Sequence, residues 1–155
     1  MPSTSEIHIL VIFSCDTGAV ERLALAAAVG AVQARAAIRL RRIVNPGEAV
    51  FAGTERLDQD YVSPRESDTA WADGFVLAVP DRFSLDFLNK VGSLGGLEGK
   101  PVVLFGRIHA CTVLKGAEIL SEIEIDRVNR DEALQFGRRV AETSRARRGS
   151  PLRNP

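Results

Sequence analysis

The sequence is poor in cysteine, has no long apolar run and carries no excess charge of either sign. Two cysteines, Cys15 and Cys111, are too few for a disulfide framework, so we expect a reducing, cytoplasmic setting. No apolar run reaches the ~18 residues of a membrane helix, and the first residues lack the pattern of a secretion signal. Lys and Arg number 20, as do Asp and Glu, so no electrostatic argument favours nucleic acid as a partner. His8 and His109 are far apart, and no spacing around them indicates a metal site.

What remains is an ordinary globular composition, 45% apolar and 26% charged, in a chain of 155 residues. That length suits one domain with a substantial core, which we assign to residues 1–144. The last stretch, Arg145–Pro155, is basic and contains proline, and we expect it to be a disordered tail.

Several short runs predict buried strands because they are apolar on both faces. The clearest is Phe75–Val79, which must stop at Pro80 because proline cannot donate to a sheet ladder. The run Ala37–Val44 instead alternates apolar and basic residues, which is typical of an edge strand protected by its arginines. We predict strands at Ile7–Phe13, Ala37–Val44, Phe75–Val79, Pro101–Phe105 and Ile119–Ile125.

Helical periodicity connects these strands, and Asn129 or Asp131 can cap the last helix. The segment Asn45–Thr69 is long for a plain connection, and such loops are often functional. We predict helices at about Ala19–Arg35, Asp68–Asp73, Ser84–Val91, His109–Leu120 (interrupted near Gly116) and Asp131–Ser144. The alternation predicts an α/β fold: a flavodoxin-like, doubly wound sheet of about five parallel strands, in the order 2-1-3-4-5, with helices on both faces.

In such a sheet the ligand binds beyond the carboxyl ends of the strands, here where the winding reverses between the first and third. The loop Ser14–Gly18 leads from the first strand into a helix, whose free N–H groups and positive dipole end can hold an anion. The alternative is an ordinary turn in which Thr17 caps the helix. Cys15 could be a reactive thiol beside that helix start, but a small apolar filler is the more common role.

Two longer stretches resemble known families. ILVIFSCDTGAVERLALAAAVGA is similar to the first strand, phosphate loop and first helix of flavodoxin-like proteins. AWADGFVLAVPDRF, followed by LEGKPVVLFG, resembles the NAD(P)H:quinone oxidoreductases of the tryptophan-repressor-binding-protein family. The resemblance implies that FMN is bound, with its phosphate in the first loop and its ring against the P-x-R-F element. It also implies NAD(P)H as donor and a quinone or other small molecule as acceptor, and it leaves a homo-oligomer open.

Carried over onto this chain, the resemblance assigns FMN binding to two loops and the end of the fourth strand. It assigns no catalytic side chain, because the flavin supplies the chemistry. The cofactor-binding residues are Ser14, Cys15, Asp16, Thr17, Gly18, Ala19, Val20, Pro80, Asp81, Arg82, Phe83 and Gly106.

The chain also departs from the family pattern. Cys15 and Val20 replace hydroxyl side chains of the phosphate loop, and no Gly-rich loop follows Gly106. Asp16 and Asp81 add carboxylates, and two unit charges ~5 Å apart repel by ~3 kcal/mol, about two decades of affinity. The alternative function is therefore a flavodoxin-fold protein that has lost FMN and serves as a non-enzymatic binding or oligomerisation module.

Single residues near the two loops allow further interpretations. Asp16 and Asp81 could together hold Mg²⁺, although fold analogy alone supports this weakly. Arg82 and Arg107 could bind a nicotinamide phosphate or a quinone oxygen, or simply be surface arginines. Phe83 could stack on a flavin ring or belong to the core.

Overall fold

The computed structural model describes residues 6–14, 18–44, 61–79, 84–106, 114 and 116–148. Five strands form one parallel sheet in the order β2-β1-β3-β4-β5, which confirms the predicted doubly wound arrangement. The first and last residues of each strand lie within two residues of the predicted ones. The strands are β1 (Ile7–Phe13), β2 (Ala36–Arg42), β3 (Gly74–Ala78), β4 (Pro101–Phe105) and β5 (Glu118–Ile123).

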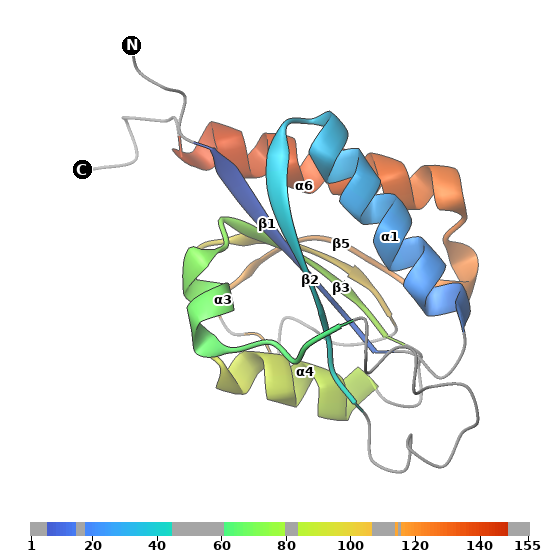
Figure 1. The fold of residues 1–155 in the computed structure, drawn as a ribbon, viewed down its shortest axis with the longest axis horizontal. Helices are drawn as coiled ribbons and strands as arrows, with labels where there is room; N and C mark the ends of the chain where they lie inside the picture. The colour runs from blue at the N-terminus through green and yellow to red at the C-terminus, as the bar shows by residue number, and fades with distance from the viewer. Residues whose placement is uncertain are drawn as a thin grey trace.

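Helices cover both faces of the sheet (Figure 1). On one face lie α1 (Gly18–Gln33) and α6 (Arg130–Arg148), and on the other α3 (Glu66–Trp71) and α4 (Ser84–Ser93). Alternate residues of β1 point to opposite layers: Val11 and Phe13 join the core under α1 and α6, whereas Ile12 joins the core under α4. A short 3₁₀ helix, η3 (Ile125–Arg127), precedes α6. Within the described residues, no helix combines the length and the hydropathy needed to cross a bilayer.

The central strands β3 and β4 are buried along their whole length, as two-sided apolar runs predict. The edge position of β2 is also confirmed, but its arginines do not shield the edge as predicted. Arg39 and Arg41 turn toward α3 and bind Asp68, while Arg42 is buried. Charge on this edge strand therefore serves internal pairing.

The prediction of a helix over His109–Leu120 is wrong in its described part. Residues 118–120 belong to β5, which pairs in parallel with β4. Gly116 adopts a φ of 87°, a left-handed conformation that interrupts a helix. The alternating pattern that follows Gly116 therefore determines the local structure, and the helical spacing before it does not extend into β5.

The prediction that the tail begins at Arg145 is also wrong, because α6 continues to Arg148. Arg145 donates to the carbonyl of Ala34 at 2.7 Å, and Arg148 pairs with Asp73 at 2.9 Å. A basic composition predicts disorder only if the charges have no partners in the fold. At the other end of α6, Asn129 is confirmed as the cap, because its Oδ1 accepts the N–H of Glu132 at 2.8 Å.

Candidate functional site

The carboxyl ends of β1, β3 and β4 meet at one edge of the sheet. The Ser14 N–H donates to the carbonyl of Ala78 at 2.9 Å, and the Val79 N–H donates to that of Phe105 at 3.0 Å. The Gly106 N–H continues the ladder toward β5 at 2.7 Å. The chain leaves β1 through α1 on one face and leaves β3 toward α4 on the other. The switch point of the sheet therefore lies at this edge, between the carboxyl ends of β1 and β3.

Five of the twelve predicted cofactor-binding residues lie in the described part of the chain. Ser14 and Gly106 stand at the switch-point edge, with β3 between them. Gly18 and Ala19 are exposed at the start of α1, whereas the Val20 side chain is buried, so only its backbone could face an anion. The predicted residues outside the described ranges are Cys15, Asp16, Thr17, Pro80, Asp81, Arg82 and Phe83, together with Arg107, His109 and Cys111.

A guanidinium that the sequence reasoning missed lies at the start of α1. A Cβ placed on Gly18 would be 3.2 Å from Nη1 of Arg22, so this side chain folds back along the first helical turn. The spacing of four residues is the signal that could have found it, because residues four apart share a helix face. The positive end of the α1 dipole and a full positive charge therefore coincide.

A buried carboxylate lies in the same helical turn. Glu21 is 7% exposed, and its Oε2 accepts a 2.7 Å hydrogen bond from the hydroxyl of Tyr61. The Tyr61 ring also packs edge-on against Phe13, with ring centroids 4.8 Å apart. Tyr61 thus fastens the segment before α3 to the ends of β1 and α1. Sequence reasoning missed this contact because its partners are 40 residues apart.

We expect Tyr61→Phe to lower the free energy of unfolding by about 1–3 kcal/mol, because a buried carboxylate loses a donor while the ring contact stays. Urea denaturation at neutral pH measures the change. In a double-mutant cycle with Glu21→Gln, the combined loss should be smaller than the sum of the single losses. Strictly additive losses would show that the hydroxyl and the carboxylate do not act together.

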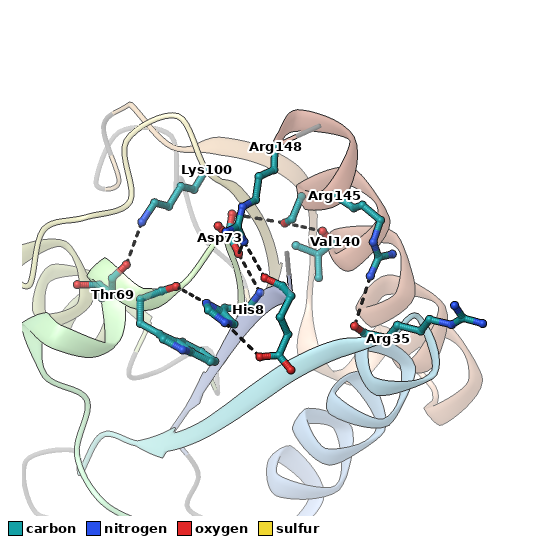
Figure 2. A network of polar contacts seen from close by, with 11 residues as sticks. His8, Arg35, Thr69, Asp73, Lys100, Val140, Arg145 and Arg148 are labelled. Carbon is teal, nitrogen blue, oxygen red and sulfur yellow. Dashed lines mark hydrogen bonds and ion pairs between the residues drawn. The ribbon is translucent and has the colours of Figure 1, made fainter. Parts of the chain in front are cut away.

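A second polar cluster lies at the opposite, amino-terminal edge of the sheet (Figure 2). The His8 ring stacks on Trp71 at 4.3 Å, and the Arg39 guanidinium lies 4.1 Å from the Trp71 ring centroid. Asp73 accepts hydrogen bonds from the His8 N–H and from Arg148, both at 2.9 Å. These groups satisfy one another and tie β1, β3 and α6 together, which indicates a structural role.

Lys100 belongs to the same edge and donates to the carbonyl of Thr69 at 3.0 Å. Burial lowers the pKa of the Lys100 ammonium, while the nearby charge of Asp73 acts in the opposite direction. Among the residues that the structure describes, no group of three His, Cys, Asp or Glu side chains is arranged to bind a metal.

Comparisons with known proteins place this geometry in a fold group. No family model matches the chain, and no curated protein sequence matches it. Solved structures do match, among them the diflavin flavoprotein A3 from Nostoc sp., with 12% identity and a TM-score of 0.62 over 97% of this chain and 99% of that one. The fold is flavodoxin-like.

Two further flavodoxin-like structures agree with this one. A short-chain flavodoxin associated with a non-canonical PDU bacterial microcompartment has 15% identity and a TM-score of 0.59, covering 89% of this chain and 99% of its own. Oxidised flavodoxin 2 from Bacillus cereus has 19% identity and a TM-score of 0.52, with 88% and 99% covered. At identities this low, the structural matches show the flavodoxin-like fold alone. Membership of the quinone-oxidoreductase family therefore stays a prediction.

Proposed function

We propose that this protein binds FMN at the carboxyl edge of its sheet and passes electrons from NAD(P)H to a quinone or another small acceptor. The observation that carries the proposal is the meeting of Ser14, Val79 and Gly106 at the switch point, where doubly wound sheets bind their ligands. Similar solved structures include a diflavin flavoprotein and two flavodoxins, and their names support flavin as the ligand.

The start of α1 suits the phosphate of FMN. A guanidinium at the positive end of a helix is unfavourable by about 0.3–1 kcal/mol on its own, and a bound anion reverses the sign of that interaction. Arg22, beside the exposed Gly18, thus supplies a charge where Cys15 and Val20 replace the expected hydroxyl side chains. Because the Asp16 carboxylate would repel the phosphate, we expect FMN to bind with a dissociation constant in the micromolar range.

Bound FMN would supply the redox chemistry by accepting a hydride and passing electrons on. The chain itself binds and orients: Arg22 and the first turn of α1 hold the phosphate. At the end of β4, a Cβ on Gly106 would lie 3.0 Å from Cγ1 of Val79 and 3.4 Å from the carbonyl oxygen of Val79. Glycine there lets the ends of β3 and β4 lie close together and leaves the edge open.

FMN fluorescence quenching provides the test. We expect saturable quenching by the wild type, and a loss of affinity of about tenfold or more in Arg22→Gln, since hydrogen bonds to charged groups contribute about 1.5–3 kcal/mol. Arg130→Gln is the matched control, because Arg130 opens α6 and not α1. With oxygen excluded, FMN-loaded protein should then oxidise more than one equivalent of NADPH or NADH only when a quinone is present.

Absence of quenching at high micromolar FMN would overturn the proposal. If Asp81→Thr then acquired FMN binding, the chain would fit the alternative of a flavodoxin-fold module that has lost its cofactor. Equal weakening by Arg22→Gln and Arg130→Gln would remove the phosphate role of Arg22 while leaving flavin binding itself in place.

A further inference from the structure

A hollow of about 690 Å³ lies between the outer surface of α1 and the segment where η3 leads into α6. In Figure 1 the start of α1 lies beside that segment. Eight of the twelve lining residues are apolar, including Ala26 and Val128, which are 6% and 7% exposed. The polar ones include Arg22, Arg130 and a single acid, Asp126.

The hollow follows from the way the two helices cross. A Cβ on Gly30 would lie 1.9 Å from the carbonyl oxygen of Leu134, so α1 and α6 touch there with no side chain between them. The lining residues of α1 all precede Gly30, and those of α6 extend no further than Leu134. Toward their amino-terminal ends the two helices move apart. Residues Ile125 to Val128 fill only part of the space between them.

The size and chemistry of the hollow select its occupant. Its volume falls within the roughly 300–1,000 Å³ typical of small-molecule sites. The walls favour a hydrocarbon or aromatic body, and two arginines against one aspartate favour a negative group. Neither the Arg22 guanidinium nor the Arg130 guanidinium has an ion pair or hydrogen bond within the part of the chain that the structure describes. The first turn of α6 is already capped by Asn129, so recognition of the charge falls to the arginines.

We propose that this hollow binds a small amphipathic carboxylate, with its apolar body against α1 and α6 and its negative group on Arg130 and Arg22. The hollow adjoins the proposed phosphate site and shares Ala19 and Arg22 with it, but its apolar walls belong to α1, α6 and the segment before α6, and binding there does not require flavin. Because Arg22 also figures in the FMN proposal, the test variants use Val29 and Arg130. Failure of one proposal therefore leaves the other measurable.

Isothermal titration of the full chain with decanoate, below its micellar concentration, tests the proposal. We expect saturable binding of decanoate and binding of decyltrimethylammonium at least ~10-fold weaker, because the rim is cationic. Val29→Trp should fill the hollow and reduce decanoate affinity by about tenfold or more. Val32→Trp is the matched control: Val29 and Val32 are 48% and 51% exposed on the same helix, and Val32 does not line the hollow. Arg130→Gln should weaken decanoate by about tenfold and leave FMN affinity unchanged.

Four results would overturn the proposal. One is no decanoate binding by the wild type up to millimolar concentration. Another is equal loss in Val29→Trp and Val32→Trp when circular dichroism shows both folded. The third is a wild-type dimer in light scattering that Val29→Trp makes monomeric, which would assign the hollow to a second copy of the chain. Preference for the decyl cation over decanoate would likewise exclude a carboxylate ligand.

Discussion

Gly30→Ala should destabilise the protein by about 2 kcal/mol or more, although alanine is the better helix former by about 1 kcal/mol. The added Cβ would lie 1.9 Å from the carbonyl oxygen of Leu134. That oxygen belongs to the α6 backbone and cannot move aside as a flexible side chain can. The same holds at Gly137, where a Cβ would lie 1.9 Å from the carbonyl oxygen of Ala27. Each substitution must push the two helices apart and loosen the core beneath them.

Urea denaturation of Gly30→Ala beside Val29→Ala separates packing from helix propensity. Val29 precedes Gly30 on α1 and is 48% exposed, so its replacement should change the free energy of unfolding by no more than about 0.5 kcal/mol. Gly137→Ala should resemble Gly30→Ala, and the double variant should lose less than the sum, because one helix displacement serves both. A Gly30→Ala protein more stable than the wild type would show that α1 and α6 do not touch at this point.

The sheet could be predicted from the sequence because its signals are local. Two-sided apolar runs mark β1, β3 and β4, and the mixed run of β2 marks an edge, so the strand order follows from topology rules. The inward face of α6 could be predicted as well, because helical periodicity in the sequence brings together Ala133, Leu134, Gly137, Val140 and Ala141. What could not be predicted is that Gly137 meets the backbone at Ala27, since periodicity gives a face and not the residue that packs on it.

The candidate site could likewise be predicted only in part. Ser14 and Gly106 could be placed at the switch-point edge because each directly follows a strand. The contact of Tyr61 with Glu21 could not, because it depends on how a distant segment folds back over α1. The wrongly placed start of the tail has a related cause. Composition counts the charge of Arg148 as solvated, whereas the fold gives it Asp73, 75 residues away in the sequence.

Asp68→Asn should lower the free energy of unfolding by about 3 kcal/mol at neutral pH, since removal of one partner leaves partly buried cations unpaired. Asp68 is 4% exposed and accepts hydrogen bonds from Arg39 at 2.9 Å and from Arg41 at 3.0 and 3.1 Å. It also accepts the N–H of Arg65 at 2.9 Å, which closes the first turn of α3. One carboxylate therefore joins β2 to α3.

The same carboxylate makes stability depend on pH. Burial alone would raise the pKa of Asp68, but hydrogen bonds from Arg41, the Arg65 N–H and Arg39 outweigh it and hold this pKa below its ordinary value. The folded state thus binds its proton less readily than the unfolded state. The stabilisation is complete above the unfolded pKa of about 4 and is lost as the pH falls through the lower folded pKa.

Urea denaturation from neutral pH into the acid range measures both effects. The stability of the wild type should fall below about pH 4, and that of Asp68→Asn should fall less steeply, so the two curves approach each other in acid. The matched control is Asp86→Asn, which removes an exposed carboxylate from the first turn of α4. Its curve should stay within about 1 kcal/mol of the wild-type curve over the whole pH range, because the Asp86 charge contributes no more than that at the start of α4. Parallel curves for Asp68→Asn and the wild type would show that the two arginines do not hold this carboxylate ionised.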